Sequence, residues 1–149
     1  MHKDTHWMQQ AIQLAAHAQA NNEVPIGAIL VLNDEIIGSG WNQPIANNDP
    51  TAHAEIIALR DAANKINNYR LINTTLYVTL EPCLMCAGAM IHARIKRLVF
   101  GAYDPKAGAI QSIFNVLDNI KLNHRIRYQG GILAKECGTL LCTFFKQRR

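Results

Sequence analysis

Two short segments, far apart in the sequence, do most to restrict how this 149-residue chain can fold. The first is His53-Ala54-Glu55 and the second is Pro82-Cys83-Leu84-Met85-Cys86. Each stands at the expected start of a helix, and one apolar strand joins the two helices. If both helices begin at the same edge of a sheet, one imidazole and two thiols meet there. Zinc is the natural metal for such a set, although iron or cobalt also accept these ligand types.

The spacing of these residues indicates a catalytic rather than a purely structural metal. Cys83 and Cys86 are three apart, so both thiolates face the same way on a first helical turn, where the helix dipole favours negative charge. Three protein ligands leave one open position on a tetrahedral zinc for water. Glu55 is close enough to move the protons of that water as a general acid and base. The pattern therefore favours a hydrolytic enzyme that removes an amino group.

The alternative is a closed structural zinc site with Cys137 or Cys142 as the fourth ligand. Both cysteines fall in the last expected helix. There Cys137 shares an apolar face with Phe144 and Phe145 and is adequately explained as a small core residue.

Hydrophobic periodicity and turn residues predict an alternating order of strands and helices. The expected helices cover residues 5–21, 52–64, 83–93, 112–118 and 132–145, and the expected strands cover 24–32, 35–41, 74–80, 97–102 and 126–129. Asn33-Asp34 has the residues of a tight hairpin turn, 42–50 is typical of a loop, and Thr51 or Asp49 can cap the helix that follows. This order predicts one α/β domain over 1–149, a three-layer α/β/α sandwich whose mixed five-stranded sheet carries helices on both faces.

Charge and cysteine content indicate the compartment and the partners. Lys and Arg number 15 against 11 acidic residues, and the formal net charge of +4 fits a polyanionic partner as well as a solvated basic surface. The first residues lack the pattern of a secretory signal, and we expect no membrane association. A C-x-x-C beside an H-x-E favours reduced thiols, so the expected location is cytoplasmic.

Three stretches together are similar to a known family. Val24-Pro25-Ile26-Gly27-Ala28, residues 50–55 (PTAHAE) and residues 79–89 (TLEPCLMCAGA) resemble the bacterial tRNA-specific adenosine deaminases, members of the zinc-dependent cytidine-deaminase-like superfamily. The likeness runs from about Trp7 to Phe145. It implies a cytidine-deaminase-like fold and a homodimer with one zinc per subunit, held by His53, Cys83 and Cys86. It also implies that Glu55 shuttles protons while the wobble adenosine of a tRNA anticodon stem-loop becomes inosine and ammonia is released.

The same resemblance implies two substrate contacts. Asn42 matches the asparagine that hydrogen-bonds the purine, although such a residue can also use its amide locally in a turn. Asp104 lies in a loop that contacts the nucleotide beside the target, where a carboxylate can accept a ribose 2′-hydroxyl; its other reading is the start of the Asp-Pro turn. Tyr103 stands where some relatives carry arginine and could stack on a base.

Several further polar residues resemble RNA-facing elements of the family. They are the segment 123–125, the tail 145–149, and the basic side chains of Lys106, Arg148 and Arg149, which can neutralise phosphates or simply be solvated.

Two rival functions remain open from the sequence. One is the same chemistry on a small molecule such as guanine, cytosine or a nucleoside, because the hydrolytic motif is shared. The other is a non-catalytic, zinc-stabilised RNA-binding module, which would need no carboxylate beside the metal.

Overall fold

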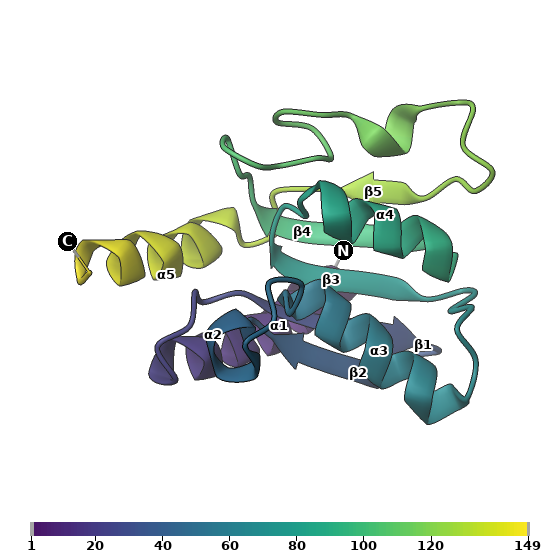
Figure 1. Cartoon of the computed structure of the whole chain (residues 1–149). Helices are drawn as coiled ribbons and strands as arrows, with labels where there is room; N and C mark the ends of the chain where they lie inside the picture. Colours follow the sequence, from purple (N-terminus) through teal and green to yellow (C-terminus); the bar gives the residue numbers. More distant parts are fainter. Residues whose placement is uncertain (1, 149) are drawn as a thin grey trace.

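A five-stranded mixed sheet forms the centre of the computed structural model, which describes residues 2–148 (Figure 1). The strand order is β2-β1-β3-β4-β5. β1 is antiparallel to both β2 and β3, whereas β3, β4 and β5 are parallel. The strands are β1 (Gly27–Leu32), β2 (Glu35–Trp41), β3 (Thr75–Leu80), β4 (Arg97–Ala102) and β5 (Arg127–Gln129). The expected mixed sheet is therefore confirmed.

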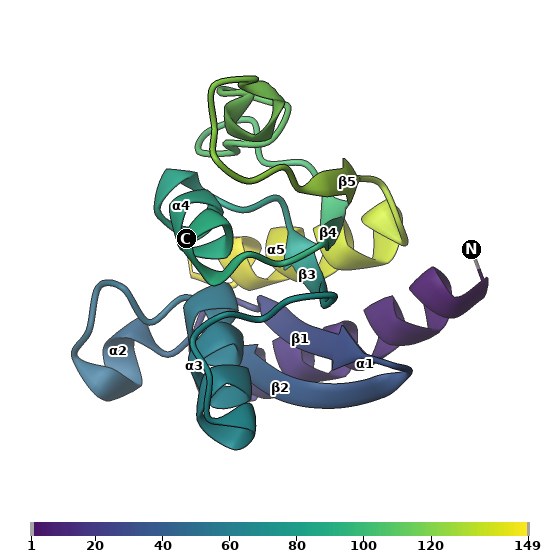
Figure 2. The ribbon, with the colours of Figure 1, turned by 90° about the vertical axis from the view of Figure 1, so that its right-hand side faces the viewer.

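Helices cover both faces of this sheet, as Figure 2 shows most clearly. Leu76 and Val78 of β3 face α3 (Ala54–Ile66) and α4 (Leu84–Ala93) in one core. Tyr77, between them, packs on the opposite face with α1 (His2–Ala20) and α5 (Ala134–Lys146). The alternation follows from the two-residue period of a strand. The three-layer α/β/α architecture is thus confirmed. No helix within residues 2–148 has the length and apolar character needed to span a membrane.

The close seat of α3 on the sheet depends on a glycine. A Cβ atom built on Gly40 of β2 would lie 2.5 Å from the carbonyl oxygen of Ala54 in the first turn of α3. Any larger residue at this position would push the helix away from the strand. The backbone of β2 and the start of α3 are therefore in direct contact.

The hairpin turn was predicted correctly, whereas the predictions of a loop over 42–50 and of a helix over 112–118 were not accurate. Asn33 and Asp34 both adopt positive φ angles, 51° and 61°, as a two-residue hairpin turn requires. The expected loop 42–50 contains a short helix, α2 (Pro44–Asn47). The expected helix over 112–118 is wrong: only the 3₁₀ turn η1 (Val116–Asp118) forms, because the N–H groups of Ile113, Phe114 and Val116 donate to the carbonyls of Gly108 and Ala109 and not to carbonyls four residues earlier.

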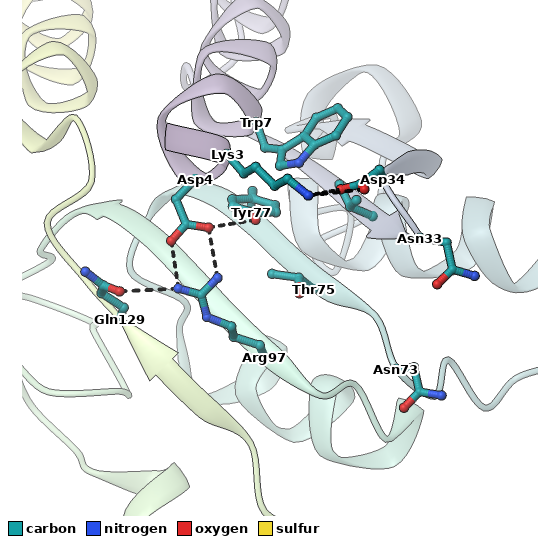
Figure 3. Close-up of a pocket in the computed structure, with 11 residues that line it drawn as sticks. Lys3, Asp4, Trp7, Asn33, Asp34, Asn73, Thr75, Tyr77, Arg97 and Gln129 are labelled. Atoms are coloured by element: carbon teal, nitrogen blue, oxygen red, sulfur yellow. Dashed lines mark hydrogen bonds and ion pairs between the residues drawn. The ribbon is translucent and has the colours of Figure 1, made fainter. Parts of the chain in front are cut away.

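A buried ion pair fixes the start of α1 to the sheet (Figure 3). The two Asp4 carboxylate oxygens accept hydrogen bonds from Arg97 of β4 at 2.8 and 2.7 Å, and the Tyr77 hydroxyl donates to Asp4 at 2.8 Å. Arg97 also donates to Gln129 of β5 at 3.3 Å. Asp4 is only 4% exposed, so these partners replace the water that its charge would otherwise bind.

We expect Asp4→Asn to lower the free energy of unfolding at neutral pH by about 2 kcal/mol, because hydrogen bonds to a charged group contribute about 1.5–3 kcal/mol. Hydrogen bonding and charge from Arg97 hold the pKa of Asp4 below its usual 3.8 in the folded protein. The native state therefore binds this proton less readily than the unfolded chain. The wild-type advantage is complete above pH 3.8 and disappears as the pH falls through the lowered pKa.

Urea unfolding of both proteins over a pH series measures this difference directly. A gap between wild type and Asp4→Asn that stays constant through the acid range would contradict the assignment.

Candidate metal and catalytic site

The three expected metal ligands meet at the end of β3, where α3 and α4 begin. His53 and Cys83 are the N-cap residues of α3 and α4, and each backbone carbonyl accepts the first hydrogen bond of its helix. The His53 Nδ1 atom lies 3.6 Å from the Sγ atoms of both Cys83 and Cys86. The three ligand atoms are all within 4.8 Å of one another. Two helix N-termini joined by one strand do converge on a single point.

These distances fit zinc. With Zn–N and Zn–S bonds of about 2.1 and 2.3 Å, tetrahedral angles place nitrogen and sulfur about 3.6 Å apart. The measured His53–Cys83 and His53–Cys86 separations have this value. Within residues 2–148, the only group of three or more His, Cys, Asp or Glu side chains placed to bind an ion consists of these three. Cys137 is buried in the core on the other face of the sheet, and Cys142 is exposed on α5, so neither closes the site.

Hydrogen bonds among the three ligand side chains shift their pKa values. A hydrogen bond from the Cys86 thiol and a second one with His53 lower the pKa of Cys83 to about 4. The same bond to Cys83, together with burial, raises the pKa of Cys86. The bond to Cys83 also raises the pKa of His53, against the effect of burial. One thiolate is thus present at neutral pH, and a metal that binds both sulfurs displaces the remaining protons.

Glu55, the second residue of α3, is buried beside these ligands. Its side chain is 4% exposed, and burial raises its pKa to about 7, with a smaller contribution from the Cys83 charge. A carboxyl group with this pKa can both accept and return a proton near neutral pH. A closed structural zinc site would not need a proton-accepting carboxyl group beside its ligands.

Asn42, at the end of β2, connects the sheet to the metal ligands. Its Oδ1 atom accepts the N–H of Ala54 at 2.8 Å, which makes Asn42 the side-chain cap of α3. The expected cap by Asp49 or Thr51 is wrong, because the Asp49 carboxylate accepts hydrogen bonds from the backbone and hydroxyl of Thr51 instead. With its oxygen engaged, the Asn42 amide offers Nδ2 as a donor. Asn42 also lines a cavity at the ends of β3 and β4.

This cavity has a volume of about 850 Å³ and lies between the strand ends and α5. Tyr103 and Asp104 form part of its wall. Asp104 Oδ1 accepts the backbone N–H groups of Lys106 and Ala107, so the local turn role foreseen from the sequence is present. Tyr103 is half exposed and packs edge-on against Phe100. Asp104 and Tyr103 are thus placed beside the cavity that leads to Asn42.

The C-terminal residues and the segment 123–125 differ in where they lie relative to the cavity. Phe144 is buried, whereas Phe145, which shares its apolar helix face in the sequence, is half exposed and lines the cavity. The Arg148 guanidinium lies 3.6 Å from the Phe144 ring centroid and donates to Asn22 Oδ1 at 3.2 Å. Arg149 lies outside the described residues. The segment 123–125 is tied to the opposite end of β4, since His124 bonds the carbonyl oxygen of Ile95 at 2.6 Å.

Two buried carboxylates beside the site were not identified from the sequence. Glu23 and Glu81 are each 2% exposed. Glu23 accepts the N–H groups of Ile45 and Ala46 at the start of α2, and Glu81 accepts hydrogen bonds from the loop after β4. An acidic residue directly before Pro82 at the end of an apolar strand is the signal that could have revealed Glu81.

Comparisons with known proteins place the chain in one family. Residues 1–102 match the cytidine and deoxycytidylate deaminase zinc-binding region. A tRNA-specific adenosine deaminase of Haemophilus influenzae is 58% identical over 147 residues, which cover 98% of this chain and 85% of that protein. The Bacillus subtilis protein of the same description is 42% identical, covering 100% of this chain and 92% of its own.

Solved structures agree with this result. One, from a study of A-to-I editing by tRNA:A34 deaminases at the wobble position, has a TM-score of 0.89 at 42% identity and covers 92% of this chain and 99% of its own. A guanine deaminase from Nitrosomonas europaea has a TM-score of 0.79 at 23% identity, covering 94% and 83%, which shows a shared fold alone.

Proposed function

Because the chain belongs to the cytidine and deoxycytidylate deaminase zinc-binding family, and within it to the tRNA-specific adenosine deaminases, we propose that it deaminates adenosine at the wobble position of a tRNA anticodon. The reaction adds water, converts adenosine to inosine and releases ammonia. The observation that carries this proposal is the buried Glu55 beside the three ligand atoms, in a chain 58% identical to a relative of that description.

The chain's own groups supply the proton transfers. When bound, zinc holds water in its open position and lowers the pKa of that water to about 7. Glu55 accepts a proton from the attacking water and passes it to a ring nitrogen of the purine. It then accepts the second proton from the added hydroxyl group and delivers it to the amino group, so that the carbonyl of inosine forms as ammonia leaves. Burial of Glu55 keeps these protons away from bulk solvent.

The cavity walls supply substrate contacts. We assign Asn42 Nδ2 as the donor to the purine, since its Oδ1 is held by Ala54. Asp104 has one carboxylate oxygen in its own turn, and the second can accept a ribose 2′-hydroxyl. Tyr103 offers an exposed ring for stacking on a neighbouring base. Lys106 and Lys146 line the same cavity and suit phosphates.

We expect the zinc-loaded protein to form inosine in an anticodon stem-loop that carries adenosine at the wobble position. Digestion of the product to nucleosides and mass spectrometry measures the conversion. A stem-loop with guanosine at that position is the matched control and should stay unchanged. Turnover of free guanine or cytidine with no inosine in the stem-loop would contradict the proposal and favour a small-molecule deaminase.

A homodimer is part of the proposal. Leu84 and Met85 at the start of α4 are 54% and 37% exposed, and an apolar groove of about 350 Å³ runs between α3 and α4. A second copy of the chain would bury these side chains next to the metal ligands. Sedimentation equilibrium at micromolar concentration tests this, and a monomer throughout would contradict it.

The proposed location is the cytoplasm. The substrate is a tRNA, and the ligand pair Cys83 and Cys86 requires reduced thiols, which the cytoplasm maintains. Fractionation of expressing cells, with activity measured in each fraction, tests the location, and activity confined to another compartment would contradict it.

A further inference from the structure

The buried side chain of Glu81 accepts hydrogen bonds from both ends of the loop that follows β4. Its Oε1 atom accepts the N–H of Asp104 at 3.0 Å and the hydroxyl of Ser112. Its Oε2 atom accepts the N–H groups of Ile110, Gln111 and Ser112 at 3.1, 2.7 and 3.0 Å. Both ends of the loop 104–112 therefore bind one carboxylate. Hydrogen bonds to a charged acceptor are the strong ones, and here they are shielded from water.

The same residue joins this loop to the metal ligands. Glu81 lies between the end of β3 and Pro82-Cys83, and its backbone N–H donates to the carbonyl of Ala102 at 2.8 Å. The N–H of Ala109 donates to the carbonyl of Pro82 at 2.8 Å. The position of the loop is therefore defined relative to Cys83.

Gly108 shows how closely the loop surrounds the carboxylate. A Cβ atom at Gly108 would come within 2.4 Å of Glu81 Oε1 and 2.6 Å of the Asp104 carbonyl oxygen. Such contacts cannot be accommodated without moving the loop or the carboxylate. The absence of a side chain at Gly108 is thus part of how Glu81 is enclosed.

We propose that Glu81 is a positioning residue for substrate binding: its carboxylate holds the loop 104–112 so that Tyr103 and Asp104 form one wall of the cavity that Asn42 also lines. The identity of the substrate rests on the function proposed above. Glu81 itself does not line the cavity, so it acts through the loop and not by touching RNA. Its loss moves the wall and weakens binding, whereas the ligand atoms and Glu55 keep their places.

The test is Glu81→Gln, which keeps the size of the side chain but replaces one acceptor oxygen with an amide donor that faces N–H groups. We expect KM for the wobble-adenosine stem-loop to rise about tenfold while kcat changes by less than about threefold, the pattern of a lost binding interaction. Zinc content should equal that of wild type. Hydrogen exchange of the free protein should become faster in residues 104–112.

Two further variants separate positioning from general destabilisation. Asp4→Asn also disrupts a buried, hydrogen-bonded carboxylate, but at the far end of the sheet. It should lower stability without changing KM or exchange in 104–112. Gly108→Ala should reproduce the KM effect, and the double variant with Glu81→Gln should be no worse than either single change, because both act on one contact.

Three results would overturn the proposal. An unchanged KM despite faster exchange would mean that the position of the loop does not matter for binding. Unchanged exchange would mean that Glu81 does not hold the loop. A fall in zinc content, or in kcat alone, would place its effect at the metal. Because exchange is measured without substrate, it tests the role of Glu81 in the loop even if wild type forms no inosine.

Discussion

Replacing Glu55 with glutamine should remove nearly all deaminase activity while the protein keeps its fold and its zinc. Glutamine has the same size but cannot accept and return a proton, and positioned acid–base groups contribute about 10²–10⁴-fold to rate. We therefore expect kcat to fall by about 10²-fold or more. Stability should not decrease, because burial already disfavours the charged form and raises the pKa of Glu55 to about 7.

Three measurements check this result: single-turnover conversion of the stem-loop, zinc by mass spectrometry and urea unfolding. Glu35→Gln is a suitable control, because Glu35 is an exposed glutamate of β2 whose carboxyl has no part in the site. Undiminished turnover in Glu55→Gln would refute the proton-transfer role and favour a non-catalytic zinc module.

The second large effect is expected for Cys83→Ala, which should lose zinc, activity and stability together. Its Sγ atom lies 3.6 Å from His53 Nδ1, and in the described part of the chain it belongs to the only group of three such side chains placed to bind an ion. An ion that binds only the folded state stabilises it by about 4 kcal/mol when free metal is 1,000 times the Kd. Wild type should gain this increment on zinc addition, and the variant should not.

Cys137→Ala is the matched control. It also removes a buried thiol, but from the core between the sheet and α5, so stability should fall while zinc stays bound. Full zinc occupancy in Cys83→Ala would contradict ligation, whereas removal of zinc from wild type by a chelator should reproduce the loss of activity seen in the variant.

The sheet and the metal ligands could be predicted because their signals are local. Helix α3 leads away from His53 and strand β3 returns to Cys83, so the starts of α3 and α4 lie at the same edge of the sheet. The hairpin at Asn33-Asp34 was equally local, since few residues accept two successive positive φ angles.

The missed features depend on contacts between distant segments. No local pattern shows that Asn42 caps α3, because the partner N–H is that of Ala54 after an intervening loop. The helix expected over 112–118 did not form, because the N–H groups of Ile113, Phe114 and Val116 donate to carbonyls of the preceding loop that lie more than four residues back. Phe145 continues the apolar face of the last helix in the sequence, yet it is half exposed and lines the cavity.

The direct contact between Gly40 and the first turn of α3 has a consequence for how this protein can diverge. Because the backbone of β2 lies directly against the backbone of α3 there, the position of His53, the residue before Ala54, follows the position of the strand. A single added carbon at Gly40 would shift His53 at once.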